Sequence, residues 1–451
     1  MRKLFGTDGV RGIANMELTS DLAFKLGQAA AYVLAGELNR KPRIMVGTDT
    51  RISCDMLECA LNAGLCSVGA DVISLGVIPT PGVAYITAKY KADAGVVISA
   101  SHNSYEFNGI KFFDSQAYKL PDEIEARIEE FVFADVNLPH KTGENIGRII
   151  KKTGYRKDYL EFLVSQSEMR LEGMKVLLDC ANGAAYSIAP IVFKRLGAET
   201  TAINASPDGL NINLNCGSTH PGKLSRRVVA GGYDIGFAYD GDADRVIAVA
   251  EDGSVIDGDR MLGVLALDLK RKNLLSNNAI VITIMSNMGL DKLAAENGIA
   301  VVRTKVGDRY VIEEMKRSGC SLGGEQSGHV ILRDCNTTGD GILTSIKIAG
   351  IIAGGNASAS SVMNVMEEYP QITVNARIGN SGGTGVMEDS LILAMIGAIE
   401  GELNGEGRLI IRPSGTEPVV RVMIEGRDGD YIRKKAGEMV ELIESRFREE
   451  E

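Results

Sequence analysis

The chain has 451 residues, of which 45% are hydrophobic and 24% charged, and its formal net charge at pH 7 is −10. This length suits about three or four domains, and the composition is that of an ordinary globular protein. The acidic balance argues against a nucleic-acid-binding function, which normally requires a basic face, whereas a few local arginines and lysines can still dominate a cleft for a phosphorylated ligand.

The seven cysteines include no C-x-x-C pair, which favours reduced thiols in a cytoplasmic protein. The first residues lack the apolar stretch of a signal peptide. No run approaches the ~18–20 apolar residues that span a bilayer. We therefore expect a cytoplasmic protein that does not engage a membrane.

The chain opens with Phe5–Gly12, which reads Phe-Gly-Thr-Asp-Gly-Val-Arg-Gly. Its glycines let the backbone turn and approach a ligand closely, and Arg11 supplies a cationic fork suited to phosphate. A glycine-rich turn with a surface arginine is the alternative interpretation.

Helices and strands then alternate. Residues 20–38 have the apolar spacing of a helix, and 43–51 read as an apolar strand followed by a polar turn. A helix at 53–69, a strand at 71–75 and a helix at 82–89 are predicted next. This alternation is typical of an α/β unit with a parallel or mixed sheet.

A buried strand at Val96–Ile98 runs directly into Ser99, Ser101, His102 and Asn103. Polar residues at the end of a strand in an open α/β sheet lie where ligands bind. We predict that Ser101 carries and passes on a phosphoryl group. The alternative is a strand end whose Ser and Asn cap a turn.

Asn108–Gly109 predicts a hairpin turn after this segment. The strand expected at 110–113 would bring Lys111 back beside the serine. An acidic amphipathic helix at 120–133 follows, and residues 134–154 read as a linker with a little β-structure.

The plan of 43–51 recurs at 175–183 and again at 280–289, each time as an apolar strand, a polar turn, a glycine and a helix. This recurrence predicts an α/β fold of three related α/β units with mixed sheets plus a smaller C-terminal α+β domain, arranged around a central cleft. The expected domains are a phosphoserine domain at 1–154, a metal-binding domain at 155–255, a sugar-binding domain at 256–368 and a C-terminal phosphate-binding domain at 369–451.

Asp240, Asp242 and Asp244 alternate directly after an apolar strand in the second unit. Such alternation places the three carboxylates on one side of an extended segment, and their repulsion calls for a hard cation such as Mg²⁺ or Ca²⁺. An EF-hand is rejected, since the position that needs glycine is Arg245 and both flanks are strand-like. An acidic surface turn is the remaining alternative.

The third unit adds a basic turn at 303–309, which contains Arg309, and a glycine loop at 323–329. Glu325 and Ser327 could share the hydroxyls of a sugar, because such hydroxyls both donate and accept hydrogen bonds. His329 could be an acid or base, although a hydrogen-bonded histidine at the start of a strand is the simpler interpretation.

The last unit contains a strand that ends at Arg412, followed by a tight turn and then Arg421. Hydroxyls and backbone N–H groups beside arginines make an anion nest. The turn consists of Ser414, Gly415 and Thr416. The chain has no lysine-bearing P-loop and no Rossmann glycine fingerprint, so neither an NTPase nor a dinucleotide site is expected.

Four motifs in this order resemble those of the α-D-phosphohexomutases over essentially the full length of the chain. They are Ile98-Ser-Ala-Ser-His-Asn103, Asp240-Gly-Asp-Ala-Asp-Arg245, Gly324-Glu-Gln-Ser-Gly328 and Arg412-Pro-Ser-Gly-Thr416. The opening Phe5–Gly12 is typical of the glucosamine branch. Ser104 and Phe107 depart from the family pattern, in which proline follows the Ser-His-Asn and a polar residue precedes Asn-Gly.

The resemblance implies an isomerase that interconverts glucosamine-6-phosphate and glucosamine-1-phosphate and so feeds UDP-N-acetylglucosamine synthesis. It implies one Mg²⁺ per chain, a phosphate on Ser101, and a sugar 1,6-bisphosphate as intermediate and activator. The expected partner is a small-molecule sugar phosphate, with no nucleic acid and no membrane, and a homodimer is possible.

The site residues implied by the resemblance fall into three groups. The catalytic residues would be Ser101, Lys111, His102 and Arg11, with Lys111 favoured as base. The metal ligands would be Ser101, Asp240, Asp242 and Asp244. The substrate-binding residues would be Arg245, Arg309, Glu325, Ser327, Arg412, Ser414, Gly415, Thr416 and Arg421.

Three other functions fit some of the same residues. Phosphoglucomutase or phosphomannomutase activity could dominate, since the glycine loop at 323–329, hereafter the sugar loop, does not visibly read a 2-amino group. A metal-dependent sugar phosphatase would use similar groups. A non-catalytic sugar-phosphate sensor would be expected to lack Ser101 or the aspartates, all of which are present.

Overall fold

The structure is a computed structural model that describes residues 4–6, 8–35, 40–134, 138–151, 154–355, 357–379, 385–413 and 419–447. The chain divides into two compact bodies, which are described separately. The N-terminal body comprises Met1–Met285 and Asn297–Val365, and the C-terminal body comprises Ser286–Glu296 and Met366–Glu451. Among the described residues, no helix combines the length and apolarity needed to cross a bilayer.

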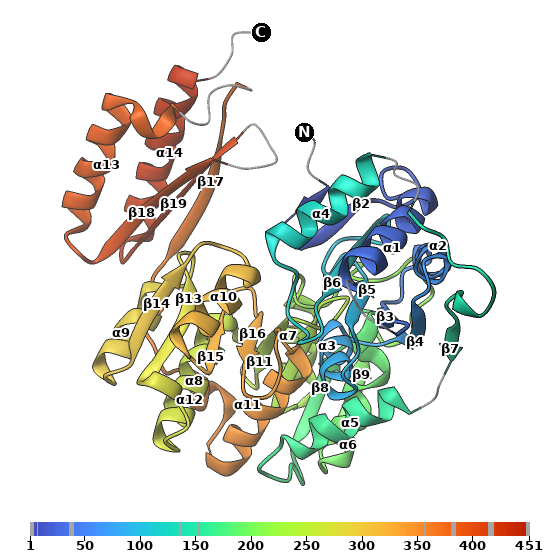
Figure 1. Ribbon diagram of the computed structural model, residues 1–451. Coiled ribbons are helices and arrows are strands. Elements are labelled where there is room, and N and C mark those ends of the chain that lie inside the picture. The colour runs from blue at the N-terminus through green and yellow to red at the C-terminus, as the bar shows by residue number, and fades with distance from the viewer. Residues whose placement is uncertain are drawn as a thin grey trace. The chain divides into compact units, whose positions relative to one another are not determined.

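The first sheet of the N-terminal body has the strand order β1-β2-β6-β5-β3-β4-β7 (Figure 1). Its strands are β1 (Phe5–Gly6), β2 (Gly9–Ile13), β3 (Arg43–Thr48), β4 (Asp71–Val77), β5 (Ala94–Ile98), β6 (Phe107–Phe113) and β7 (Ile149–Lys151). β3, β4, β5 and β7 are parallel, whereas β1, β2 and β6 join in antiparallel pairs.

Alternation along β3 directs its side chains to opposite faces of this sheet. Ile44 and Val46 join the apolar core shared with α1, α2 and α4. Gly47 lies on the other face, where an added Cβ would lie 2.5 Å from Val83 of α3. The helices of this unit are α1 (Ser20–Ala35), α2 (Ser53–Ser67), α3 (Thr80–Lys89) and α4 (Asp122–Phe133), with the short 3₁₀ turn η1 (Gly143–Asn145).

The second sheet has the order β12-β11-β10-β8-β9. Its strands are β8 (Lys175–Asp179), β9 (Glu199–Ile203), β10 (Ile235–Tyr239), β11 (Val246–Ala250) and β12 (Val255–Ile256). The helical segments here are α5 (Tyr155–Ser165), η2 (Ala184–Ser187), α6 (Ala189–Arg195) and α7 (Gly222–Gly231).

The third sheet has the order β14-β13-β15-β16. Its strands are β13 (Ala279–Thr283), β14 (Ala300–Thr304), β15 (Leu322–Gly324) and β16 (Val330–Leu332). The helical segments of this region are α8 (Gly258–Arg271), η3 (Ser276–Asn278), α10 (Asp308–Ser318), α11 (Gly341–Gly355) and α12 (Ala359–Met363).

The three sheets share one four-stranded plan. β3, β8 and β13 each lie between two parallel neighbours, and the strand after the second neighbour returns antiparallel. The returning strands are β6, β11 and β16. The prediction of three related α/β units with mixed sheets is therefore confirmed.

The C-terminal body contains a three-stranded antiparallel sheet of order β17-β19-β18. Its elements are α9 (Met288–Glu296), β17 (Gln371–Arg377), η4 (Val386–Glu388), α13 (Ser390–Leu403), β18 (Gly407–Pro413), β19 (Val419–Gly426) and α14 (Gly429–Phe447). A separate apolar core joins α13 and α14 to the sheet, as expected for a smaller α+β domain.

The prediction of a hairpin turn at Asn108–Gly109 was wrong. Both residues lie inside β6, where Gly109 pairs with Arg11 of β2. The chain reverses earlier, between Ser99 and Phe107. Pairing with strands on both sides outweighs the local turn preference of Asn-Gly.

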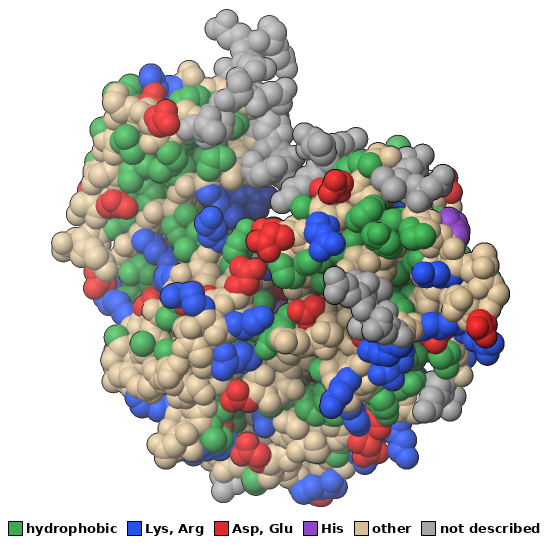
Figure 2. All heavy atoms as spheres, viewed as in Figure 1, with side chains coloured by type: hydrophobic (Ala, Val, Ile, Leu, Met, Phe, Trp, Pro, Cys, Tyr) green, Lys and Arg blue, Asp and Glu red, His purple; other side chains and the backbone are tan. Residues whose placement is uncertain are grey.

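The cysteines are all free, and four of the seven are buried. Charged side chains of both signs are intermixed over the visible face of the molecule (Figure 2).

Candidate active site

Two loops of the N-terminal body meet at Ser101. One follows β5 and carries Ser101, and the other follows β10 and carries Asp240, 139 residues further along the chain. Ser101 Oγ donates a hydrogen bond to Asp240 Oδ2 at 2.6 Å, and both residues are fully buried. β5 and β10 hold equivalent places in two related units, and each loop leaves the carboxyl end of its strand, where ligands bind in open α/β sheets.

Backbone conformation brings the two loops into contact. Ser101 and Ala243 adopt left-handed backbone conformations with φ of 53° and 57°, which non-glycine residues rarely occupy. A Cβ at Gly241 would lie 2.5 Å from the carbonyl oxygen of Ser101. We call residues 99–107, from the end of β5 to the first residue of β6, the serine loop, and residues 240–245, between β10 and β11, the metal loop. Glycine is therefore needed at position 241, where the metal loop passes the serine loop.

The three aspartates of the metal loop form a buried cluster. One carboxylate oxygen from each of Asp240, Asp242 and Asp244 lies within 4.8 Å of the other two. Asp242 Oδ1 and Asp244 Oδ1 are buried without a hydrogen-bond partner. Burial, followed by the charges of Asp244 and Asp242, raises the pKa of Asp240 well above its ordinary value. Crowded carboxylates with unpaired oxygens fit a hard divalent cation.

Lys111 lies beside this cluster, because β6 pairs it with Val97 of β5. Its Nζ donates to Asp242 Oδ2 at 2.7 Å and lies 3.1 Å from Asp8 Oδ2. Burial acts to lower the pKa of Lys111, but these carboxylates outweigh it and raise the pKa above the ordinary value. The side chain is therefore an ammonium, which can give a proton and can take one only after losing its own.

His102 lies close to the serine hydroxyl and to Arg245. Its Nδ1 is 3.4 Å from Ser101 Oγ and 3.3 Å from the guanidinium of Arg245. Burial, followed by the charges of Arg245 and Arg11, lowers the pKa of His102 to about 4. The imidazole is therefore neutral at pH 7. Arg11 itself forms an ion pair with Asp8.

The glycine loop between β15 and β16 presents the predicted sugar-binding residues in different environments. Glu325 is buried, and its Oε1 accepts a hydrogen bond from Gly307 N at 3.0 Å. Ser327 is exposed. His329 is 1% exposed, accepts a hydrogen bond from Gly339 N and lies 3.6 Å from Asp244. Its surroundings match the simpler interpretation of a hydrogen-bonded histidine before a strand.

Arg309 is engaged by carboxylates of another helix. Its guanidinium lies 2.6 Å from Asp122 and 3.1 Å from Glu125, both on α4. Its predicted role in substrate binding therefore requires one of these ion pairs to be shared or broken.

In the C-terminal body, Arg412 of β18 lies directly opposite Arg421 of β19. Burial and the charge of Arg421 lower the pKa of Arg412. Like charges on opposed positions repel each other, and an anion between them would relieve that repulsion. Ser414, Gly415 and Thr416 lie outside the described residues.

Comparison with protein families identifies four consecutive segments. Models of the phosphoglucomutase/phosphomannomutase α/β/α domains I, II and III match residues 2–138, 157–253 and 257–369, and the model of the C-terminal domain matches 374–442. The chain belongs to the phosphoglucomutase/phosphomannomutase family.

Curated members of this family resemble the chain over its whole length. A phosphoglucosamine mutase of Acetivibrio thermocellus is 54% identical over 450 residues, which cover 99% of this chain and 100% of the relative. One from Clostridioides difficile is 53% identical over 451 residues, with the same coverage of each chain.

Solved structures of more distant members share the fold. A phosphoglucomutase/phosphomannomutase family protein of Burkholderia thailandensis superposes with a TM-score of 0.81 at 23% identity, covering 99% of this chain and 98% of the other. Aspergillus fumigatus N-acetylphosphoglucosamine mutase, solved with GlcNAc-6P and magnesium, gives 0.71 at 16% identity, covering 99% and 96%. At these identities the likeness concerns the fold alone.

Two further residues touch the site but were missed in the sequence, Thr80 and Asp8. Thr80 Oγ1 donates to Asp242 Oδ2 at 2.6 Å. Asp8 forms ion pairs with Lys111 and Lys119. The available signals were weak, since Thr80 stands between two prolines and Asp8 lies three residues before Arg11.

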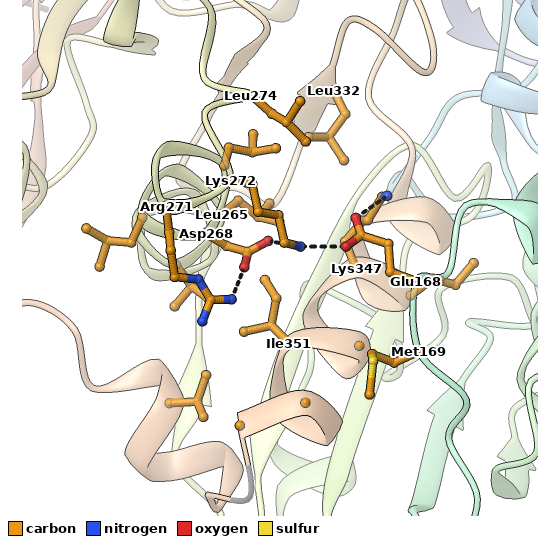
Figure 3. A pocket seen from close by; sticks show the side chains of 18 of the residues that line it. Glu168, Met169, Leu265, Asp268, Arg271, Lys272, Leu274, Leu332, Lys347 and Ile351 are labelled. Carbon is orange, nitrogen blue, oxygen red and sulfur yellow. Dashed lines mark hydrogen bonds and ion pairs between the residues drawn. The ribbon is translucent and has the colours of Figure 1, made fainter.

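A cavity of about 740 Å³ lies elsewhere in the N-terminal body, along α8, α11 and α12 (Figure 3). Its lining is largely apolar and includes a chain of ion pairs, in which Lys272 joins Asp268 at 2.6 Å and Glu168 at 2.7 Å. No lining residue belongs to the serine, metal or sugar loop. The candidate chemistry therefore lies in the loops and not in this cavity.

Proposed function

We propose that this enzyme interconverts glucosamine-6-phosphate and glucosamine-1-phosphate by phosphoryl transfer through Ser101, with a sugar 1,6-bisphosphate as intermediate. The observation that carries the proposal is the buried Ser101 hydroxyl bonded to one carboxylate of a three-aspartate cluster. The full-length relatives named phosphoglucosamine mutase support the choice of substrate.

Ser101 has the covalent role in this proposal. A bond from phosphorus to Ser101 Oγ breaks as one forms to a free hydroxyl of the sugar monophosphate, and the reverse exchange at the other hydroxyl regenerates the enzyme. In the first exchange the attacking sugar hydroxyl gives up a proton and Ser101 Oγ takes one as it leaves. In the second exchange the Ser101 hydroxyl gives up a proton and the departing sugar oxygen takes one. The neutral imidazole of His102 can take a proton, and the Lys111 ammonium can give one to Ser101 Oγ.

Asp240, Asp242, Asp244 and Ser101 would hold one Mg²⁺, whose charge would offset the negative charge that develops on the transferring phosphoryl group. Arg245 would contact the reacting phosphoryl group, with Arg11 as a further nearby cation. Glu325 and Ser327 would bind sugar hydroxyls, while Arg412, Arg421 and the turn between them would hold the second phosphate. Arg309 would help to hold substrate once it leaves Asp122.

The test is ³¹P NMR of the purified protein with Mg²⁺, a trace of sugar 1,6-bisphosphate and one hexose 6-phosphate at a time. The proposal expects a 1-phosphate signal that grows fastest from glucosamine-6-phosphate and is absent in the Ser101→Ala variant. Faster conversion of glucose or mannose esters would keep the chemistry and overturn the substrate. Release of free phosphate would indicate a phosphatase instead.

The 1-phosphate product has the chemistry needed by a nucleotidyl transfer that leads to UDP-N-acetylglucosamine, which is the metabolic role we propose. We also propose a cytoplasmic location and a homodimer, both of which stay predictions.

A further inference from the structure

The side chain of Arg51 is fully buried immediately behind the serine loop. A guanidinium has five N–H donors in a rigid fork, and here every nitrogen is engaged. Nε donates to Asp49 Oδ2 at 2.9 Å. The two terminal nitrogens donate to four main-chain carbonyl oxygens, those of Ser101, Asn103, Ser104 and Phe107.

Asp49, the ion-pair partner of Arg51, is linked through Ser99 to the main-chain amide of Ser101. Asp49 Oδ2 also accepts a hydrogen bond from Ser99 Oγ at 2.6 Å. Ser99 Oγ in turn accepts one from Ser101 N at 3.0 Å. The buried Arg51–Asp49 ion pair therefore reaches both the amide and the carbonyl group of Ser101.

A residue of the second α/β unit donates hydrogen bonds to two of the same carbonyl oxygens. Asn213, which lies between β9 and β10, donates from Nδ2 to Ser101 O and to Asn103 O, each at 2.9 Å. The carbonyl of Ser101 thus accepts hydrogen bonds from two different α/β units.

These bonds explain how Ser101 keeps an unfavourable backbone conformation. A non-glycine residue with φ near 53° persists only where its surroundings over-determine it. In that conformation the hydroxyl points at Asp240. Loss of the hydrogen bonds to these carbonyl oxygens would let the backbone of Ser101 leave its left-handed conformation and turn the hydroxyl away from the metal loop.

We propose that Arg51 is a positioning residue, which holds four carbonyl oxygens of the serine loop so that Ser101 Oγ faces Asp240. This inference rests on the proposed function, because it concerns the serine that transfers the phosphoryl group. The side-chain hydrogen bonds of Arg51 described above go to Asp49 and to main-chain carbonyl oxygens between Ser101 and Phe107. Its loss should therefore slow the transfer step without weakening the binding of sugar phosphate.

The decisive variant is Arg51→Lys, which keeps the charge but loses the planar fork that reaches four acceptors. We expect kcat to fall on the order of 10²-fold, since misplacement of a reacting group by ~1 Å has that effect, with KM for the sugar phosphate unchanged. Guanidinium ion added to the Arg51→Ala variant should restore part of kcat.

Arg333→Lys is the matched control. Arg333 also donates to main-chain carbonyls, those of Met315 and Gly319, but at the end of α10 and away from the serine. This variant should keep wild-type kcat. Wild-type kcat in Arg51→Lys, or an equal fall in kcat in both variants, would overturn the inference and leave the proposed function intact.

If the Arg51 variants do not fold, the Asn213→Ala variant tests whether hydrogen bonds to the serine-loop carbonyls position Ser101. It removes one donor to each of two carbonyls, so kcat should fall by a smaller factor with KM unchanged, and an unaltered kcat would overturn the inference. A wild-type protein without mutase activity would instead overturn the proposed function and this inference with it.

Discussion

Each aspartate of the metal loop is held in the interior by its own partners. Asp240 accepts from Ser101, and Asp242 accepts from Lys111 and Thr80. Asp244 lies 3.6 Å from His329, and although burial acts against it, Lys111 and His329 keep the pKa of Asp244 low. Asp242 Oδ1 and Asp244 Oδ1 still accept no hydrogen bond, so the cluster is satisfied only in part until a cation binds.

Magnesium should therefore stabilise the folded chain through this cluster. At a Mg²⁺ concentration of 100 times the dissociation constant, the free energy of unfolding of the N-terminal body should rise by about 2.7 kcal/mol. Asp244→Asn removes one charge and should lose most of this gain, as thermal unfolding with and without Mg²⁺ would show. Asp268→Asn, which alters an ion pair in the remote cavity, should respond to Mg²⁺ like the wild type.

The sequence could indicate Ser101 and the three aspartates because each follows an apolar strand, a place that has a recognisable local pattern. It could not indicate Arg51 or Asn213. Their acceptors are main-chain carbonyl oxygens, which every residue possesses, so only the folded chain reveals which ones converge. The polar turn that ends the segment 43–51 was visible in the sequence, but nothing in it distinguished Arg51 from a surface arginine.

Asp340 is a buried carboxyl at the start of α11, 1% exposed. Burial raises its pKa to about 6, against hydrogen bonds from Leu343 N, Tyr159 and Asn336 that lower it. The pKa of Asp340 in the folded chain exceeds the ordinary value of 3.8, so the folded state favours the protonated carboxyl. The contribution of Asp340 to stability is therefore complete below pH 3.8 and is lost as the pH rises through 6.

Asp340→Asn should remove this pH dependence. A pKa difference of about two units corresponds to about 3 kcal/mol. Between about pH 4 and about pH 7, the free energy of unfolding of the wild type should therefore fall by up to about 3 kcal/mol more than that of the variant. Urea unfolding of both proteins across this range gives the difference. A constant difference across the range would contradict the assignment to Asp340.

At the scale of elements, the recurrent strand and turn predicted the three central strands β3, β8 and β13. Parallel neighbours on both sides bury these strands, and such strands read as continuous apolar runs. The edges of the sheets were less predictable. The pairing of β7 with β4 and of β2 with β6 joins segments that are distant in the sequence, and the Asn108–Gly109 error has the same origin.

Two helices begin against the active loops. Gly258 at the start of α8 donates from N to Gln326 O of the sugar loop, and Gly341 at the start of α11 donates to Ala243 O of the metal loop. A Cβ at Gly258 would lie only 2.0 Å from Glu325 O. The sugar loop therefore depends on glycine at the first residue of α8.

Gly258→Ala should displace Glu325 and raise KM for the sugar phosphate more than it lowers kcat. The overpacking should also reduce the free energy of unfolding by about 1–3 kcal/mol. Gly350→Ala is the control, because its Cβ would meet open space in α11, and replacing a helical glycine there should add about 0.5–1 kcal/mol. Steady-state kinetics and urea unfolding test both variants, and an unchanged KM in Gly258→Ala would refute the argument.

The whole molecule is built as two bodies with separate cores. The chain passes between them at 285/286, 296/297 and 365/366. The sequence did not predict that residues 286–296 belong to the C-terminal body. Tertiary hydrogen bonds hold this segment there, such as those of Asn287 with the main chain of Tyr369 and of Met288 N with Glu425. The four-domain division read from the sequence stays our proposal for how function is distributed.

Two cores predict two unfolding steps, since multidomain chains depart from two-state behaviour. In calorimetry of the full chain, Mg²⁺ should raise the temperature of one transition and leave the other in place, because the three aspartates lie in the N-terminal body alone and a ligand stabilises only the folded unit that binds it. Asp244→Asn should abolish that shift, which assigns the responsive transition to the N-terminal body. A single transition that moves as a whole with Mg²⁺ would show that the two bodies unfold as one cooperative unit.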